Sequence, residues 1–155
     1  MRRLQLLSAL VLLLAAGLLY LLFRPRTLLL FCVADALGAT EAVDSWRAMV
    51  TSWQLPVFMV NNLPGGLWAA SYMLIADALT AGKPWRARLA AVSVIPLTGV
   101  ASELLQAMHL LPGTPDMADA VCYLAPLFLY LHFHRTNINR LWETFSQASK
   151  SPSLS

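Results

Sequence analysis

The most informative shortage in this sequence is one of charge. Only 12% of the 155 residues are Asp, Glu, Lys or Arg, whereas 58% are hydrophobic. A soluble domain carries about 25% charged residues, so this chain has too few polar side chains to coat a globule in water. The shortage excludes an ordinary soluble domain and indicates a multi-pass membrane protein, and the chain length allows one compact bundle.

Cysteine is also scarce, because Cys32 and Cys122 are the only two in the chain. They form neither a C-x-x-C pair nor a metal-ligand spacing, and the histidines do not converge with enough carboxylates to bind a metal. We therefore expect no metal site and no cofactor. A disulfide is not expected either, since Cys122 falls inside a predicted membrane span. Internal repeats and nucleic-acid-binding motifs are lacking, so no nucleic-acid partner is expected.

Long apolar runs predict an all-α membrane protein built as a bundle of four transmembrane helices. A membrane-spanning helix needs about 20 apolar residues, and the predicted spans are residues 4–23, 64–81, 89–111 and 117–134. The basic start of the first run also fits a signal peptide, but the apolar region of a signal peptide has about 7–15 residues. We predict one membrane domain over residues 1–145 and a polar C-terminal tail over residues 146–155.

The positions of the basic residues predict the orientation of the four spans. The side of the amino terminus collects eight Lys and Arg residues, namely Arg2, Arg3, Lys83, Arg86, Arg88, Arg135, Arg140 and Lys150. The opposite side keeps three, namely Arg24, Arg26 and Arg47. Because cytoplasmic loops are enriched in Lys and Arg, both termini are expected in the cytoplasm and residues 24–63 outside it.

The extracytoplasmic segment contains two short patterns. The run "TLLLFCV" fits either a strand or an interfacial segment, since periodicity alone does not decide for so short a run. Residues 40–53 predict a helix that has Trp46, Met49, Val50 and Trp53 on one face and Arg47 on the other. Such a helix lies in the lipid headgroup region or packs on the bundle outside the membrane, and the sequence leaves both alternatives open.

Carboxylates in and beside the last two spans are the main candidates for a functional site. Glu103 and Gln106 share one helix face, and Asp116, Asp119 and Tyr123 share a face of the next helix. The short "PGTP" turn predicts antiparallel neighbours, so the two faces can meet in the outer half of the bundle. Because a charge within a span costs about 2.5–3.5 kcal/mol, we expect the carboxylates to face protein, a water-filled cleft or a partner.

Two of these three carboxylates also have an interpretation without a binding role, whereas Glu103 has no capping position to explain it. Asp116 follows Thr114-Pro115, so it and Asp119 also suit the first turn of a helix, where acidic side chains complement the helix dipole. Two residues of the second span, Trp68 and Ser71, are expected donors to the acidic groups.

A third aspartate, Asp77, is predicted near the cytoplasmic interface, where Lys83 or Arg86 neutralises it.

The motif formed by Ser102, Glu103 and Gln106, a short turn, and then Asp116 and Asp119 resembles that of the VanZ-like family of small bacterial membrane proteins. The stretch "NNLPGGLWAASYMLIAD" is similar to the entry to the second span in divergent members, so the resemblance covers residues 63–126. Two features depart from the family pattern. The link "HLLPGTPD" lacks an arginine, and Tyr123 and Pro126 stand where the family has asparagine and glycine.

The resemblance implies a multi-pass protein of the bacterial cytoplasmic (inner) membrane, associated with lower sensitivity to teicoplanin or with cell-envelope polysaccharide systems. The leading hypothesis is a non-enzymatic protein in the lipid bilayer that binds a lipid-linked or cell-wall component, or a partner membrane protein, through an outer acidic cleft. One alternative is an intramembrane enzyme in which Glu103 is a general base oriented by Asp119. Another is a small proton-coupled transporter.

Overall fold

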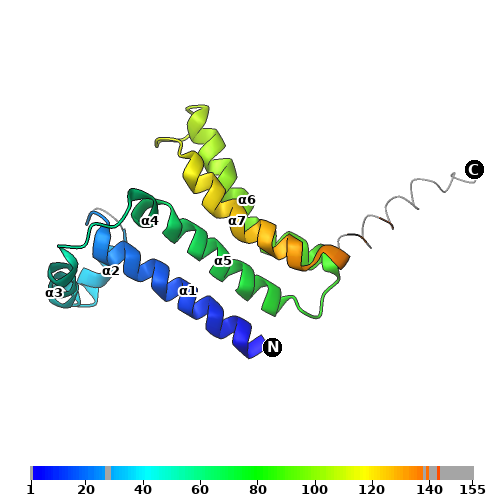
Figure 1. Cartoon of the computed structure of the whole chain (residues 1–155), viewed down its shortest axis with the longest axis horizontal. Coiled ribbons are helices and arrows are strands. Elements are labelled where there is room, and N and C mark those ends of the chain that lie inside the picture. The colour runs from blue at the N-terminus through cyan, green and yellow to red at the C-terminus, as the bar shows by residue number, and fades with distance from the viewer. Residues whose placement is uncertain (1, 27–28, 138, 140–142, 144–155) are drawn as a thin grey trace, which may run out of the picture.

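The structure is a computed structural model, and the residues that it describes are 2–26, 29–137, 139 and 143. Within these residues the chain forms seven helices and no strand, which confirms the predicted all-α class. The helices are α1 (Arg2–Phe23), α2 (Leu29–Ala36), α3 (Thr40–Val50), α4 (Val57–Asn61), α5 (Leu63–Leu79), α6 (Trp85–Ala107) and α7 (Met117–Phe133) (Figure 1). The polar tail predicted for residues 146–155 lies outside the described residues.

Helix α5 is at the centre of the fold, because it packs against α1, α6 and α7. It lies antiparallel to α1, and the α6–α7 pair packs on its other side and rises away from it at one end (Figure 1). Small side chains permit the close approach of α1 and α5, since Ala9, Ala16 and Ala69 are fully buried. The main core lies where α5, α6 and α7 meet and contains Met73, Ala76, Val92 and Leu127.

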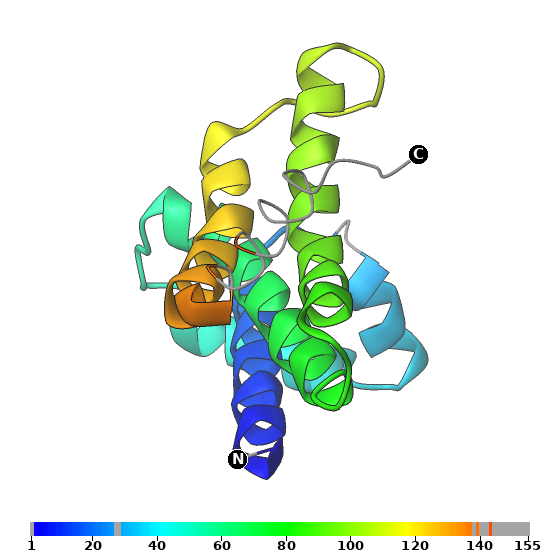
Figure 2. The same cartoon turned by 90° about the vertical axis from the view of Figure 1, so that its right-hand side faces the viewer.

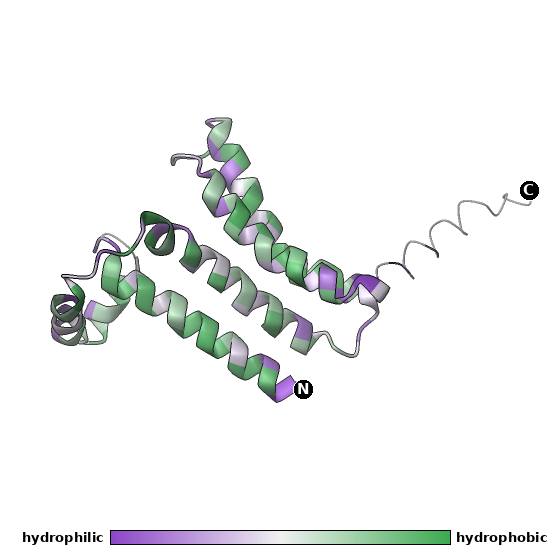
Figure 3. Cartoon of the chain, viewed as in Figure 1, coloured by the Kyte–Doolittle hydropathy of each residue, from purple (hydrophilic) through white to green (hydrophobic). Residues whose placement is uncertain are grey.

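Much of the apolar side-chain surface stays uncovered by protein. Eight leucine and valine side chains of α1 are 42–69% exposed, namely Leu4, Leu6, Leu7, Leu10, Val11, Leu13, Leu14 and Leu18. Figure 3 shows hydrophobic colouring along most of α1, with hydrophilic colouring at its N-terminal end. Among the described residues, α1 and α6 are long and apolar enough to cross a membrane. An apolar surface of this extent is unusual on a soluble monomer and indicates membrane association.

The boundaries of α1, α5 and α7 agree with the predicted ones to within two residues. The boundaries predicted for α6 are wrong, because this helix begins and ends four residues earlier. Residues 89–111 were expected, whereas α6 runs from Trp85 to Ala107. It ends in a Schellman motif, in which the Leu110 amide donates to the Leu105 carbonyl at 2.9 Å. His109 takes the left-handed conformation with φ 59°. The link to α7 is therefore longer than the predicted turn, and it arches between the two helix ends (Figure 2).

The described part of the segment between α1 and α5 contains the helices α2, α3 and α4. The strand alternative for "TLLLFCV" is wrong, because the last five residues of this run belong to α2. Helix α3 confirms the predicted amphipathic helix, yet the side chain it buries is Val43, while Trp46 and Met49 are 47% and 66% exposed. Arg47 was expected on the face opposite Trp46 and Met49. It is half-buried and donates from Nη1 to the carbonyls of Leu21 at 2.6 Å and Arg24 at 3.0 Å. A cation at the C-terminus of α1 complements the helix dipole.

Candidate functional site

The structure brings Glu103, Asp116 and Asp119 together around one asparagine. The Asn62 amide nitrogen donates to Asp116 Oδ2 at 2.7 Å and to Asp119 Oδ1 at 3.0 Å. The backbone amide of Asp116 donates to Glu103 Oε2 at 2.8 Å. Both Asn62 and Glu103 are buried, with 4% and 9% of their surface exposed. We call these four residues the acidic cluster.

Three chain segments position the acidic cluster. Asn62 lies at the junction of α4 and α5, and Glu103 lies in the last two turns of α6. Asp116 is the N-cap of α7, since its Oδ1 accepts from the Ala118 amide at 2.8 Å. Two hydrogen bonds lower the pKa of the Asp116 carboxyl. The bond from Asn62 has the larger effect, and the bond from the Ala118 amide has the smaller one. Asp116 therefore fills the capping role expected from "TPD" and also contacts the other members of the cluster.

Negative charge exceeds positive charge at the acidic cluster. The charge of one arginine, Arg24, interacts with Asp119, and its Nη1 donates to Asn61 Oδ1 at 2.7 Å. Within the described ranges, the three carboxylates of the cluster therefore outnumber the guanidinium groups that interact with them. Among the described residues, Glu103 Oε1 and Asp119 Oδ2 accept no hydrogen bond. Free carboxylate oxygens are acceptors only, so this cluster suits hydroxyl and ammonium groups.

A hollow of about 220 Å³ begins within one helical turn of the acidic cluster. Its walls come from α5, α6 and α7 and include Trp68, Thr98, Gly99, Ser102 and Tyr123. We call it the aromatic groove. The Tyr123 ring packs on Gly99 so closely that a Cβ at that glycine would lie 2.6 Å from the ring. Trp68 is 42% exposed and stacks on Tyr20 of α1 with ring centroids 5.0 Å apart.

Two predicted site residues lie elsewhere. Ser71 is 1% exposed and donates to the Ala9 carbonyl of α1 at 2.8 Å, so its hydroxyl faces the α1–α5 contact and not the acidic groups. Gln106 is half-buried beside the link after α6, where a Cβ at Gly113 would lie 2.8 Å from the Gln106 amide carbon. The expectation that Ser71 donates to the acidic cluster is therefore wrong.

A second polar cluster, at the opposite end of α5, centres on Asp77. This carboxylate is 4% exposed and accepts hydrogen bonds from Gln5 at 2.9 Å, from Tyr130 at 2.6 Å and from Arg88. The sequence prediction chose Lys83 or Arg86 as its partner and missed Arg88. Asp77 precedes the end of α5 by two residues and Arg88 follows the start of α6 by three, so the hairpin places them at the same level.

The Asp77 cluster ties four helices together, because its donors come from α1, α6 and α7. Beside it, the rings of Trp85, Tyr130 and His134 stack pairwise. Their centroids lie 5.7 Å apart for Trp85 and Tyr130, 5.2 Å for Trp85 and His134, and 4.3 Å for Tyr130 and His134. The polar side chains of this cluster therefore serve helix packing and ion pairing.

In the part of the chain that the structure describes, no group of three His, Cys, Asp or Glu side chains lies in a position to hold a metal ion. Comparison of the chain with family models, with curated proteins and with solved structures finds no match.

Proposed function

We propose that the chain is a four-span membrane protein in which α1, α5, α6 and α7 cross the bilayer and both termini face the cytoplasm. The exposed leucines of α1 and the length of α6 support this placement. Helices α5 and α7 have 17 residues each, about 25 Å at 1.5 Å per residue. That length approaches the hydrocarbon thickness of about 30 Å, and the polar clusters lie near the helix ends.

We further propose that the protein is a VanZ-like envelope protein of the bacterial inner membrane and binds a lipid-linked cell-wall component at the acidic cluster. The observation that carries this proposal is a buried Glu103 that accepts from the Asp116 amide, with Asp119 held by the same asparagine as Asp116, next to the aromatic groove. The free carboxylate oxygens would accept hydrogen bonds from the sugar or amino groups of the ligand. Trp68 and Tyr123 would contact its apolar part.

Binding is favoured over catalysis by the way the carboxylates are held. Glu103 Oε2 accepts the Asp116 amide, and both oxygens of Asp116 accept hydrogen bonds from Ala118 and Asn62. Fixed acceptors of this kind suit recognition of a headgroup that has many hydrogen-bond donors. Removal of one acceptor from the protein then leaves one donor of the ligand unpaired. A partner membrane protein with hydroxyl or ammonium side chains would satisfy the same acceptors.

The test uses the full chain in detergent micelles and a polyprenyl-pyrophosphate-linked disaccharide peptide from bacterial cell-wall synthesis as the probe. Binding is followed by intrinsic tryptophan fluorescence, since Trp68 lines the aromatic groove. We expect Glu103→Gln and Asp119→Asn each to weaken binding about tenfold, because a hydrogen bond to a charged group contributes about 1.5–3 kcal/mol.

Glu41→Gln is the matched control, since Glu41 is exposed on α3, away from the acidic cluster. It should bind as the unchanged chain does. Equal binding by Glu103→Gln and the unchanged chain would contradict the proposal. Loss of helical circular dichroism in both cluster variants would show that the carboxylates serve folding instead.

A further inference from the structure

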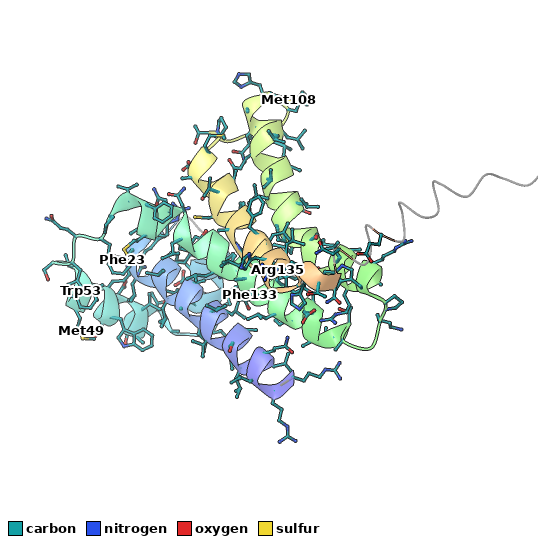
Figure 4. All side chains as sticks on the ribbon, turned by 45° about the vertical axis from the view of Figure 1, so that its right-hand side comes forward. Phe23, Met49, Trp53, Met108, Phe133 and Arg135 are labelled. Atoms are coloured by element: carbon teal, nitrogen blue, oxygen red, sulfur yellow. The ribbon has the colours of Figure 1, made fainter. Side chains whose placement is uncertain are left out.

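Helix α3 packs against the C-terminal half of α1 and leaves two adjoining hollows between them. Figure 4 shows Phe23, Met49 and Trp53 at this end of the molecule. One hollow, of about 270 Å³, has only apolar walls, among them Leu18 and Trp46. The other, of about 240 Å³, is lined by polar as well as apolar side chains. Both include Leu22 and Val50, so together they form one groove with an apolar and a polar half. We call it the α1–α3 groove.

The polar half of the α1–α3 groove contains Arg47 and Thr51. Arg47 is the one charged residue among those that line the groove. Its hydrogen bonds to the α1 carbonyls both use Nη1, although a guanidinium has five N–H donors. The neighbouring carboxylate, Asp44, pairs with Arg26. Among the described residues, Arg47 therefore keeps a positive charge without a carboxylate partner.

The two halves follow the direction of α1. Leu18 precedes Leu22 by one helical turn, about 6 Å along the axis, whereas Arg47 bonds to the carbonyls at the end of α1. A ligand with a charged end at Arg47 would therefore have its apolar end pointing along α1, away from the helix terminus. This is the arrangement of a lipid in the leaflet that borders this end of α1, and exposed Trp46 and Trp53 suit the same interfacial depth.

We infer that the α1–α3 groove binds one anionic glycerophospholipid of the surrounding bilayer. Its phosphodiester lies against Arg47 and Thr51, and one acyl chain follows Leu22 and Leu18. Guanidinium groups bind phosphate through charge-assisted hydrogen bonds, and the apolar half accepts only hydrocarbon. This lipid site is distinct from the acidic cluster, which is built from other helices and has the opposite charge.

The test measures quenching of tryptophan fluorescence in the full chain in detergent micelles by phosphatidylglycerol brominated on its acyl chains. Saturable quenching is expected, with Trp46 beside the bound chain. Brominated diacylglycerol, which has the same chains without phosphate, should quench about tenfold more weakly. Inorganic phosphate should not compete, because it lacks a chain to occupy the apolar half. Equal quenching by the two lipids would overturn the assignment of the phosphate to Arg47.

Two variants and one control locate the site. Arg47→Gln should weaken phosphatidylglycerol binding about tenfold. Val50→Phe should reduce it similarly by filling the place where the two hollows join, and it leaves the Arg47 hydrogen bonds intact. Arg3→Gln removes the same charge from an exposed side chain at the other end of α1 and should bind normally. Normal binding by Val50→Phe, or equal loss in Arg3→Gln, would overturn the inference.

The cell-wall probe separates this inference from the proposed function. Arg47→Gln should bind that probe normally, and Glu103→Gln should bind phosphatidylglycerol normally. The experiments can therefore refute the lipid site without refuting the proposed function, and the reverse.

Discussion

Replacement of Asp77 by alanine tests the packing of the four long helices. The side chain is 4% exposed and accepts hydrogen bonds from Gln5, Arg88 and Tyr130, so its removal leaves three donor side chains without their acceptor. Loss of one member of a buried ion pair costs about 3–5 kcal/mol. Because the Arg88 side chain is 21% exposed and regains some water, we expect the lower end, about 3 kcal/mol.

The assay is equilibrium unfolding at pH 7 in mixed micelles with an increasing fraction of sodium dodecyl sulfate, followed by helical circular dichroism. Asp44→Ala is the matched control, because the Asp44–Arg26 pair is exposed, with side-chain exposures of 52% and 45%. Exposed pairs contribute about 0–1 kcal/mol. The double variant Asp77→Leu and Arg88→Met should recover most of the loss, since it removes both charges. Equal destabilisation by Asp77→Ala and Asp44→Ala would refute the reasoning.

Two further predictions concern glycine packing and acid stability. Gly99→Ala should lower the free energy of unfolding by about 1–3 kcal/mol, because the added Cβ would lie 2.6 Å from the Tyr123 ring. A Cβ at Gly17 meets open space, so Gly17→Ala should be neutral or stabilising in the same assay. Asn62 and the Ala118 amide lower the folded-state pKa of Asp116. The ionised carboxylate therefore stabilises the fold at any pH above the unfolded-state pKa of about 4. This contribution is lost as the pH falls through the folded-state pKa. The stability difference between the unchanged chain and Asp116→Asn should therefore shrink between pH 6 and pH 3, and a difference independent of pH would contradict this explanation.

Hydrophobic run length predicted the four long helices, because long apolar runs with at most one charged residue each leave little alternative to a helix in an apolar setting. The convergence of Glu103 with Asp116 and Asp119 followed from helix periodicity and a short connection. The end of α6 could not be predicted in the same way, since the left-handed residue is His109 and not the glycine that usually marks such an end.

The partners of the carboxylates were harder to predict than the carboxylates themselves. Asn62 sits in a stretch that reads as a loop, and only the tertiary fold places it against Asp116 and Asp119. Arg47 has the spacing of a polar-face residue, but the crossing of α3 over α1 turns it toward the α1 carbonyls. In both cases the position of the side chain depends on contacts between helices that are distant in the sequence. The helical period of 3.6 residues contains no information about such contacts.

The central claim is that α1, α5, α6 and α7 all cross the bilayer, which places the acidic cluster on the non-cytoplasmic side. The most direct measurement is labelling of single cysteines in intact cells with a membrane-impermeant maleimide, after Cys32 and Cys122 are changed to serine. A cysteine introduced by Thr114→Cys, in the link between α6 and α7, should react from outside. One introduced by Gly82→Cys, between α5 and α6, should react only after the cells are permeabilised. Labelling of both positions from the same side would contradict the account.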